Sequence, residues 1–279
     1  MNVKDKIILV TGGANGIGKA LCERFYADGA ARIYVADLDF DNAEKVAESV
    51  NGKALRLDVA DEENCQNVVK QILDEAGRLD FIASNAGIGG AEGSLEISND
   101  VWRKIYEVNV LSHVFLARAA FPAMIENKFG AMMITSSAAG LLTHPTAAPY
   151  AATKHAAVAL AENLALEFGE RGIYVSCLCP QGVKTRLIDG ENNPNKFLMA
   201  EAISAEDCAE AVVKALEKEK FLILPHAEVA EYIVNKAENR DRWLHSLRKM
   251  RRHVLSERES LSLTEKKENQ PQMSADKRR

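Results

Sequence analysis

The chain lacks the features that mark several specialised classes of protein. No apolar stretch approaches the roughly 20 residues that a helix needs to cross a bilayer. The first apolar run, 7–10, is too short for a signal peptide, and no cleavage site follows it. The five cysteines are scattered and contain no Cys-x-x-Cys pair, which argues against a zinc site or a disulfide framework. No residue set for a metal-dependent mechanism is present. We therefore expect no metal, and a reducing, cytoplasmic environment.

Charge is spread unevenly over an otherwise ordinary composition. The 279 residues are 47% hydrophobic and 27% charged, which is typical of a soluble globular protein with a large core. Residues 236–279 hold 13 Lys or Arg against 7 Asp or Glu, so residues 1–235 hold 22 against 33 and carry a net charge of −11. Such a shift predicts a boundary between an acidic body and a basic C-terminal segment.

Short apolar runs alternate with longer amphipathic stretches along the body. The expected strands are 6–10, 32–36, 54–57, 81–84, 131–135, 174–178 and 221–224. The expected helices are 16–28, 40–50, 61–76, 100–127, 150–170 and 205–219. Most strand runs are continuously apolar, so both faces of the sheet should be buried. Strands separated by helices predict an α/β fold with a doubly wound, parallel sheet of about seven strands and helices on both faces.

The expected domain organisation follows from these patterns. Residues 1–225 would form a catalytic domain, within which 186–204, polar at its centre and apolar at its ends, would be a lid over the substrate. Residues 226–259 would form a helical, basic extension, and the polar segment 260–279 would be disordered. The basic segment has three possible roles: packing on the body or on a second subunit, covering the active site, or touching an anionic membrane surface.

A glycine-rich loop, Thr11-Gly12-Gly13-Ala14-Asn15-Gly16-Ile17-Gly18, joins the first expected strand to the first helix. Glycines let a backbone turn tightly and approach a diphosphate, and the N–H groups that begin the helix attract anions. A strand before the loop and a helix after it are what a dinucleotide-binding fingerprint of the Rossmann type requires. The alternative is a plain structural turn.

An acidic residue, Asp37, ends the second expected strand 19 residues after Gly18. A carboxylate at this distance can accept hydrogen bonds from the adenosine ribose hydroxyls and would repel a 2′-phosphate. No Lys or Arg directly follows Asp37, so the sequence favours NAD over NADP as the cofactor. The alternative is that Asp37 caps a helix, although Asp39 or Asp41 could do this instead.

Tyr150 and Lys154 stand four residues apart in a segment of small, helix-forming residues. Residues at i and i+4 lie on one face of a helix, which places a phenol beside an ammonium group. A nearby positive charge favours the phenolate and lowers the pKa of a tyrosine, so the pair could exchange a proton near neutral pH. Tyr and Lys also meet at this spacing by chance, so the pair depends on the other motifs for support.

Taken together, the motifs resemble those of the short-chain dehydrogenase/reductase family over about residues 4–225. They are the glycine-rich loop, Asp58-Val59, Asn85-Ala86-Gly87, Asn109, Ser136-Ser137, Tyr150-x-x-x-Lys154 and Pro180-x-x-Val183-x-Thr185. The resemblance implies an NAD-dependent oxidoreductase that interconverts a secondary alcohol and a ketone. It also implies a homodimer or homotetramer, built through the helices 100–127 and 150–170. Two departures are Gln181, where the family often has Gly, and Ser84, where it often has Asn.

The resemblance also implies individual roles. Tyr150 would be the catalytic acid/base, Lys154 would lower its pKa and bind the nicotinamide ribose, and Ser137 would bind the substrate oxygen. Asn109 would hold a water in a proton relay, or stabilise a kink in its helix, or do both. The implied cofactor contacts are Gly12, Asn15, Gly16, Ile17, Gly18, Asp37, Asp58, Val59, Asn85, Ala86, Gly87, Tyr150, Lys154, Val183 and Thr185.

The expected substrate pocket is apolar. Its candidate lining residues are Leu141, Leu142, His144, Ile188, Phe197 and Met199, with His144 and Ile188 taken as substrate contacts beside Ser137 and Tyr150. This composition favours a hydrophobic alcohol or ketone over a sugar or an acid. Two alternatives are a catalytically silent NAD-binding scaffold and an interaction module that uses the basic segment. We expect no nucleic-acid partner, no transmembrane segment and at most peripheral membrane contact.

Overall fold

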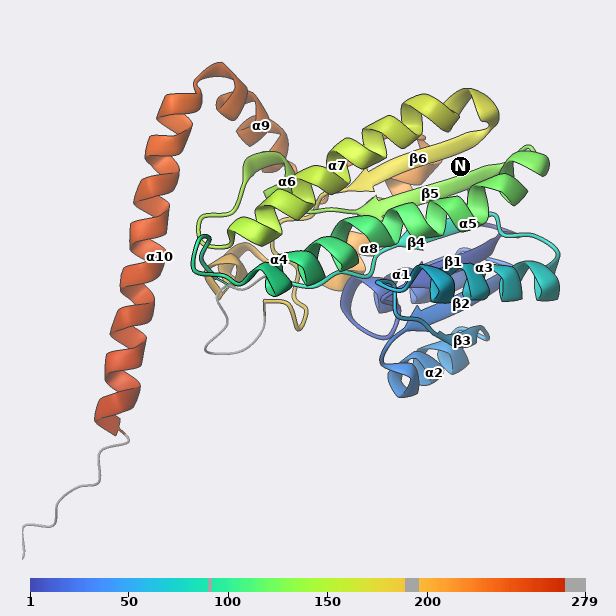
Figure 1. Cartoon of the computed structure of the whole chain (residues 1–279), viewed down its shortest axis with the longest axis horizontal. Coiled ribbons are helices and arrows are strands. Elements are labelled where there is room, and N and C mark those ends of the chain that lie inside the picture. The colour runs from blue at the N-terminus through green and yellow to red at the C-terminus, as the bar shows by residue number, and fades with distance from the viewer. Residues whose placement is uncertain (90–91, 189–195, 269–279) are drawn as a thin grey trace, which may run out of the picture. The chain divides into compact units, whose positions relative to one another are not determined.

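The structure is a computed structural model that describes residues 1–89, 92–188 and 196–268. Two compact units divide the chain, Met1–Val234 and Asn235–Arg279. The first contains a seven-stranded, fully parallel sheet in the order β3-β2-β1-β4-β5-β6-β7 (Figure 1). The strand order reverses between β1 and β4, so the chain winds outward in both directions from the centre. This arrangement confirms the predicted doubly wound α/β sheet.

The strands lie close to where the apolar runs predict them. Their bounds are β1 Ile7–Thr11, β2 Arg32–Asp37, β3 Lys53–Arg56, β4 Phe81–Ser84, β5 Gly130–Thr135, β6 Ile173–Leu178 and β7 Leu222–Ile223. Successive side chains of a strand point to opposite faces, so each strand contributes to two cores. In β1, Ile8 and Val10 belong to one core, whereas Ile7 and Leu9 belong to the other.

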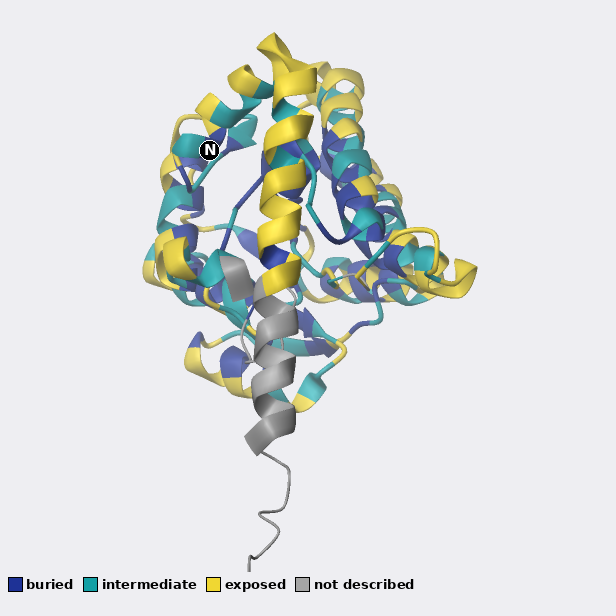
Figure 2. Ribbon diagram, turned by 90° about the vertical axis from the view of Figure 1, so that its left-hand side faces the viewer, coloured by how far each residue is buried: buried dark blue, intermediate teal, exposed yellow. Residues whose placement is uncertain are grey.

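Helices cover both faces of the sheet. On one face lie α1 Gly16–Ala27, α2 Phe40–Ser49 and α8 Ala205–Glu217. On the other lie α3 Glu62–Ala76, α5 Ser112–Glu126 and α7 Ala148–Phe168. Buried residues gather along the strands and the inner sides of these helices, and exposed residues face outward (Figure 2). The sheet is therefore enclosed, as its continuously apolar strands require.

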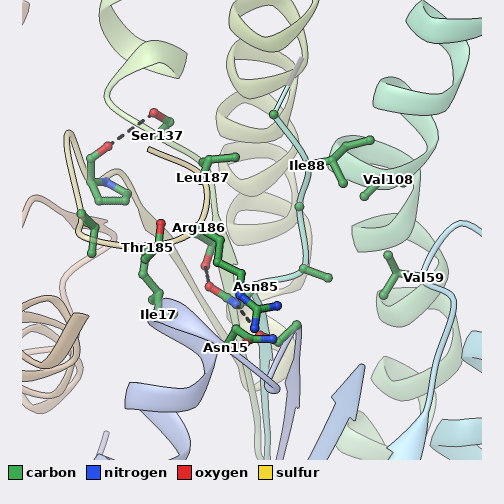
Figure 3. A pocket seen from close by; sticks show the side chains of 18 of the residues that line it. Asn15, Ile17, Val59, Asn85, Ile88, Val108, Ser137, Thr185, Arg186 and Leu187 are labelled. Atoms are coloured by element: carbon green, nitrogen blue, oxygen red, sulfur yellow. Dashed lines mark hydrogen bonds between the residues drawn. The ribbon is translucent and has the colours of Figure 1, made fainter. Parts of the chain in front are cut away.

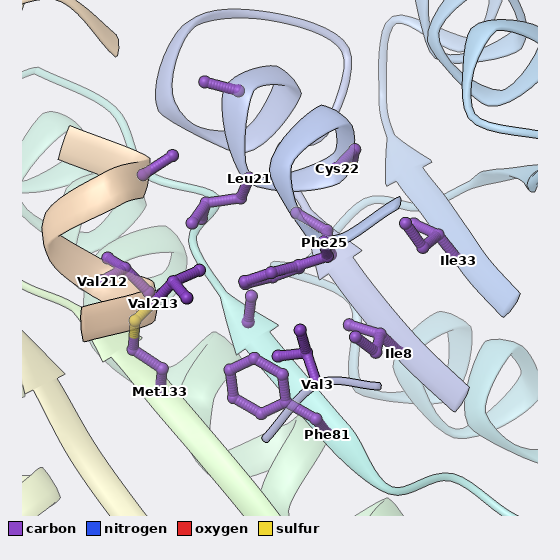
Figure 4. Packing of buried hydrophobic residues seen from close by; sticks show 14 of the residues in the cluster. Val3, Ile8, Leu21, Cys22, Phe25, Ile33, Phe81, Met133, Val212 and Val213 are labelled. Atoms are coloured by element: carbon purple, nitrogen blue, oxygen red, sulfur yellow. The ribbon is translucent and has the colours of Figure 1, made fainter. Parts of the chain in front are cut away.

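Aromatic packing anchors the first core between α1 and the sheet. Phe25 of α1 and Phe81 of β4 are both fully buried, and their rings meet edge to face with centroids 5.6 Å apart. Met133 of β5 and Val212 of α8 belong to the same cluster (Figure 4). This core fixes α1 against the sheet and thereby positions the glycine-rich loop that precedes the helix.

The segment predicted as one helix over 100–127 is interrupted. It consists of α4 Asn99–Tyr106, a π-helical turn η1 at Glu107–Leu111, and α5. The stretch Asn99–Glu126 is long and apolar enough to span a membrane by composition, but 61% of its most apolar window is buried inside the structure. Such burial is typical of a core helix.

The remaining helices are shorter or lie near the C-terminus. Three were not predicted as separate elements: α6 Ala139–Leu142, the 3₁₀ turn η2 Gly169–Arg171 and the 3₁₀ turn η3 Lys196–Glu201. The predicted helical extension divides into α9 Glu228–Glu238 and α10 Arg240–Glu268.

Helix α10 extends further than the sequence pattern indicates. Its range includes residues 260–268, which belong to the segment predicted as disordered. Residues 257–268 contain neither Gly nor Pro and are rich in Glu, Leu and Lys, all good helix formers. The rest of that segment, 269–279, lies outside the described residues.

Candidate active site

A cleft of about 560 Å³ opens at the carboxyl ends of the central strands. This is where ligands bind in open parallel sheets, beside the point at which the strand order reverses. The cleft brings together most of the predicted site residues. They are Gly12, Asn15, Gly16, Ile17, Asp37, Asp58, Val59, Asn85, Ala86, Gly87, Ser137, Tyr150, Lys154, Val183, Thr185 and Ile188.

The glycine-rich loop curves tightly into the start of α1. Gly16 has φ +53°, and a Cβ there would lie 2.9 Å from Cγ2 of Thr185. Gly18 packs so closely on the loop that a Cβ would overlap the carbonyl oxygen of Gly12. Gly18 does not line the cleft, so its place is in helix–loop packing. Asn15 precedes α1 without a side-chain capping bond, and it lies at the cleft (Figure 3).

The acidic end of the cleft is built around Asp37. Its Oδ2 accepts from the backbone N–H of Ala14 at 3.0 Å, and its Oδ1 accepts from that of Asp39 at 2.9 Å. Asp37 therefore joins the glycine-rich loop to the end of β2. Asp39, not Asp37, caps α2 by accepting from the N–H of Asn42. The alternative reading of Asp37 as a helix cap is thus wrong.

A polar network holds the ends of three strands together beneath the cleft. Thr11 at the end of β1 accepts through Oγ1 from the N–H groups of Asn85 and Ala86, at 3.0 and 3.1 Å. The Asn85 amide donates to the carbonyl of Thr11 at 3.2 Å, and its Oδ1 accepts from Oγ1 of Thr135 at 3.3 Å. Asn85 therefore connects β1, β4 and β5 directly below the cleft.

Tyr150 and Lys154 share one face of α7. The Nζ of Lys154 lies 5.7 Å from the centroid of the Tyr150 ring and donates to the carbonyl of Thr135 at 3.0 Å. Ser136, which also lines the cleft, donates from Oγ to the carbonyl of Lys154 at 2.8 Å. The hydrogen bond to β5 fixes the ammonium group in the cleft.

Burial controls the electrostatics of this pair and corrects one expectation. The pKa of Tyr150 is raised from its ordinary value, chiefly by burial, although a hydrogen bond with Ser137 partly offsets this. The pKa of Lys154 is lowered to about 8, again by burial. We expected Lys154 to lower the pKa of Tyr150. The loss of water around the buried phenol instead sets the direction of its pKa.

Ser137 lies at the same end of the cleft. Its Oγ accepts from the N–H of Ala139 at 3.1 Å and makes a long contact of 3.4 Å to the carbonyl of Pro180. The bond to Pro180 is long, so the hydroxyl can turn from it toward Tyr150 or toward a ligand oxygen. The Ser137 and Tyr150 hydroxyls and the Lys154 ammonium form the polar group at this end.

Asn109 and His144 do not line the cleft. Asn109 is fully buried in η1; its side chain accepts from the N–H of Ile88 at 2.9 Å and donates to the carbonyl of Ile88 and to Oγ1 of Thr153. His144 accepts through Nδ1 from the N–H groups of Thr146 and Ala147, and its ring meets that of Tyr150 edge to face at 6.1 Å. Asn109 thus holds the segment after β4, and His144 contacts the ring of Tyr150.

The predicted apolar pocket is reproduced only in part. Ile188 lines the cleft, whereas Leu141, Leu142 and Met199 do not. The Phe197 side chain and residues 189–195 of the proposed lid lie outside the described part of the chain.

Several lining residues were not among the predicted contacts. Ser136 and Pro180 belong to the quoted motifs, and Arg186 and Leu187 belong to the predicted lid, but none of them was assigned a contact. The others are Leu38, Leu57, Ile88, Gly89, Lys104, Val108, Thr135 and Gln181. All of these except Gly89 and Lys104 directly adjoin a residue of a predicted motif. Lys104, on α4, carries no such signal.

The groups that line the cleft fit a dinucleotide, and those that the structure describes do not form a metal site. No group of three or more His, Cys, Asp or Glu residues suited to a metal occurs in the described ranges. The glycine-rich loop suits a diphosphate, Asp37 suits ribose hydroxyls, and the polar group around Tyr150 lies at the same cleft. The cleft therefore has the parts that a nicotinamide dinucleotide requires.

Comparison with known proteins agrees with this geometry. The chain matches the family described as "short chain dehydrogenase" over residues 6–196. It is 33% identical over 236 residues to 1-deoxy-11-beta-hydroxypentalenate dehydrogenase of Streptomyces exfoliatus, covering 82% of this chain and 86% of that protein. It is 34% identical to meso-2,3-butanediol dehydrogenase of Serratia marcescens, over 68% of this chain and 76% of that one.

A solved structure extends the likeness to the fold. A short-chain dehydrogenase/reductase from Burkholderia phymatum, solved in complex with NAD, superposes with a TM-score of 0.78 at 24% identity. It covers 86% of this chain and 96% of that chain. The motifs, the sheet and the sequence match agree: the chain belongs to the short-chain dehydrogenase/reductase family, oxidoreductases that act on CH–OH groups with NAD(P).

Proposed function

We propose that this protein is an NAD-dependent oxidoreductase that interconverts a hydrophobic secondary alcohol and its ketone, with Tyr150 as the acid/base. The observation that carries the proposal is one cleft with Tyr150, Lys154 and Ser137 as its polar catalytic group and Asp37 among its lining residues. When bound, the dinucleotide supplies the hydride acceptor or donor. The residues of the chain supply orientation and proton transfer.

The proposed roles follow from the positions of the hydroxyl groups. The Ser137 hydroxyl would donate to the substrate oxygen and stabilise charge on it. Tyr150 would take the hydroxyl proton of an alcohol as hydride leaves the adjacent carbon, and would return a proton to a ketone in reverse. Lys154 would bind the nicotinamide ribose. Asn109 would hold a water molecule beside Lys154 in a proton relay. The π turn η1 would keep its amide in place.

The electrostatics of Tyr150 predict the effect of pH. Because burial raises its pKa, Tyr150 is protonated at neutral pH, the form that donates a proton to a ketone. Alcohol oxidation needs the deprotonated form, so its kcat/KM should rise with pH above 7, by up to about tenfold per unit. Ketone reduction should be flat between pH 6 and 8.

The test is an absorbance assay for NADH with a panel of alcohols. Tyr150→Phe should lower kcat at least about 1000-fold while NAD binding, followed by fluorescence or calorimetry, stays within about threefold. Tyr106→Phe, at an exposed tyrosine of α4, is the matched control and should keep full activity. Turnover by the Tyr150→Phe variant at the normal rate would overturn the assignment. NAD binding without turnover of any substrate would identify a silent, cofactor-binding protein.

The preference for NAD rests on Asp37. Its carboxylate already accepts two backbone hydrogen bonds and has lone pairs left for ribose hydroxyls, while its charge would repel a 2′-phosphate. Asp37→Arg should weaken NAD binding about tenfold or more and move the preference toward NADP. Both dissociation constants can be measured by calorimetry. Tighter binding of NADP than NAD by the unmodified chain would contradict the ribose argument.

The proposed substrate class rests on apolar side chains that line the cleft. Ile88, Val108, Leu187 and Ile188 lie around this cleft (Figure 3 labels the first three). One relative, 33% identical over 71% of this chain, is a 3beta-hydroxysteroid dehydrogenase of Mediterraneibacter gnavus. We expect steroid, terpenoid and retinoid alcohols to have a higher kcat/KM than 2,3-butanediol. The reverse order would exclude a hydrophobic substrate.

We further propose that the enzyme works in the cytoplasm. Its five cysteines are free and buried, as in a chain that does not depend on disulfides. Expression of a fluorescent fusion and cell fractionation would test the location, and recovery with an organelle or membrane fraction would overturn it.

A further inference from the structure

Arg186 is a charged residue of the cleft that none of the proposed roles uses. It directly follows Thr185 in the segment after β6, and it lines the same cleft as the glycine-rich loop. Figure 3 shows its side chain pointing into this cleft. Its guanidinium lies 3.9 Å from Oδ2 of Asp39, and the side chain is 74% exposed. A permanent cation thus stands in a site built for an anionic ligand.

The backbone before Arg186 lies directly over the phosphate end of the loop. The methyl group of Thr185 packs on Gly16, the first residue of α1, so closely that a Cβ on Gly16 would lie 2.9 Å away. The N-terminus of α1 is where the diphosphate of a dinucleotide is held. A long side chain on the next residue therefore starts within reach of that diphosphate.

Asp39 does not depend on Arg186. One of its carboxylate oxygens accepts from the N–H of Asn42 at 3.4 Å and the other from the Asn42 side-chain amide at 2.7 Å, which caps α2. The separation of 3.9 Å from Arg186 is too long for a hydrogen bond. Ion pairs between exposed side chains are weak and screened by salt. Releasing Arg186 from Asp39 should therefore cost little.

Of the cations that line the cleft, Arg186 is the best suited to bind phosphate. Among its described lining residues the cations are Lys104, Lys154 and Arg186, and the anions are Asp37 and Asp58. Lys154 is engaged by the carbonyl of Thr135 at the catalytic end. A guanidinium is always charged and matches two phosphate oxygens with parallel hydrogen bonds, which an ammonium cannot do.

We propose that Arg186 binds the diphosphate of the dinucleotide, and that it leaves Asp39 for the phosphates as the cofactor enters. The inference rests on one part of the proposed function, that the cleft binds a dinucleotide, and does not require the proposed reaction. Asp39 acts as a resting partner that keeps the guanidinium beside the cleft. The ligand chemistry recognised is phosphate, which a diphosphate or a 2′-phosphate could supply. The position of Thr185 over Gly16 favours the diphosphate.

The experiment is calorimetric binding of NAD, NADP, ADP and adenosine to the full chain. Arg186→Ala should weaken NAD and ADP by about tenfold to a hundredfold, the usual effect of losing a charge-assisted hydrogen bond, and should leave adenosine unchanged. Arg186→Lys should recover part of the loss. Lys184→Ala is the matched control, because it removes an exposed cation from the same segment that does not line the cleft.

Two further measurements test the proposal: the dependence of NAD affinity on ionic strength, and the NAD affinity of an Asp39 variant. The affinity of the unmodified chain for NAD should fall with ionic strength more steeply than that of Arg186→Ala. Asp39→Asn preserves a helix-capping side chain and should bind NAD as tightly or up to about threefold more tightly. Weaker NAD binding by this variant would contradict competition between Asp39 and phosphate.

Three further outcomes, all from the comparison of ligands and variants, would overturn the inference. The first is an equal effect of Arg186→Ala and Lys184→Ala. The second is an equal loss for adenosine and ADP, which would show a structural role. The third is a loss confined to NADP, which would assign Arg186 to the 2′-phosphate. All three outcomes are measured as dissociation constants and do not require turnover. An inactive protein would therefore count against the proposed reaction and not against the role of Arg186.

Discussion

His113 is a buried histidine that the proposed reaction does not use. It lies in α5, and its Nδ1 is 2.6 Å from Oγ of Ser84 at the end of β4. Its Nε2 has no hydrogen-bond partner among the described residues. Burial first, and the charge of Lys154 second, lower its pKa to about 3. The ring is therefore neutral at physiological pH and joins α5 to the sheet. Ser84, a departure from the family pattern, provides its partner.

This histidine should make the fold sensitive to acid. In an unfolded chain a histidine has a pKa of about 6.5, whereas burial lowers the pKa of folded His113 to about 3. Between these values the unfolded chain binds the extra proton, so stability is present above about pH 6.5 and is lost as pH falls toward 3. The loss from this group by pH 4 should be roughly 3 kcal/mol. Urea unfolding at pH 7, 6, 5 and 4 measures it.

Substitution separates this histidine from the other titrating groups. His113→Gln should give a shallower decline of unfolding free energy with falling pH than the unmodified chain. His245→Gln, at an exposed histidine of α10, should keep the original slope. Equal slopes for all three proteins would mean that His113 accepts a proton in the folded state.

Single residues also show what the sequence reveals about the site. The spacing of Tyr150, Lys154 and Ser137 correctly indicated that they meet, because helix geometry and the resemblance fix their positions. The direction of the Tyr150 pKa was wrong, because it depends on how completely the fold removes water from the phenol. Arg186 lay within the predicted lid over 186–204 but was given no role of its own, because no motif of the resemblance includes it.

At the level of secondary structure, η1 places Asn109. A π turn inserts one extra residue into a helix, and such turns are often found at functional sites. Here it lies between α4 and α5 and directs the Asn109 amide to Ile88 and Thr153. The amide thereby ties the segment after β4 to α7, which carries Tyr150. The predicted kink-stabilising role agrees with these contacts, while the water relay stays a prediction.

Removing this amide should weaken both the fold and the reaction. Asn109→Ala would leave the N–H and the carbonyl of Ile88 without their partner and free Oγ1 of Thr153. We expect a loss of about 2–4 kcal/mol in the free energy of unfolding, measured in urea, and a lower kcat. Asn163→Ala on α7, which loses one exposed bond to the carbonyl of Ala159, should cost less than about 0.5 kcal/mol. Similar losses for both variants would contradict the proposed role of η1.

Elements were predictable where the chain gives a clear apolar signal. The strand 81–84, a continuous apolar run, was predicted with both boundaries correct. The helix predicted over 61–76 is α3, with Asp61 as its cap. The π turn was not predicted, because one extra residue within five barely disturbs a helical pattern. Helix α6 has only four residues and shows no periodicity at all. Such short features depend on tertiary packing.

At the level of the whole molecule, the sheet order decides which strand ends meet. The apolar runs predicted seven parallel strands, but run lengths alone do not determine the order β3-β2-β1-β4-β5-β6-β7. That order places the ends of β1 and β4 side by side, so Thr11 can bond Asn85 across 74 residues of chain. The site is therefore a property of the complete sheet, even though each motif in it is local.

The outer face of α7 predicts self-association. Ala152, Ala159 and Leu166 are exposed at seven-residue spacing along one line of the helix, and Leu166 is 80% exposed. Small residues at such spacing let a second helix approach closely, so we expect a dimer or tetramer that light scattering reports as a multiple of 30.6 kDa. Ala159→Arg would place a charge in that contact and should shift the protein toward monomer. Ala31→Arg, at an exposed alanine before β2, should change nothing. A monomeric unmodified chain, or an unaffected Ala159→Arg variant, would rule out this face as the interface.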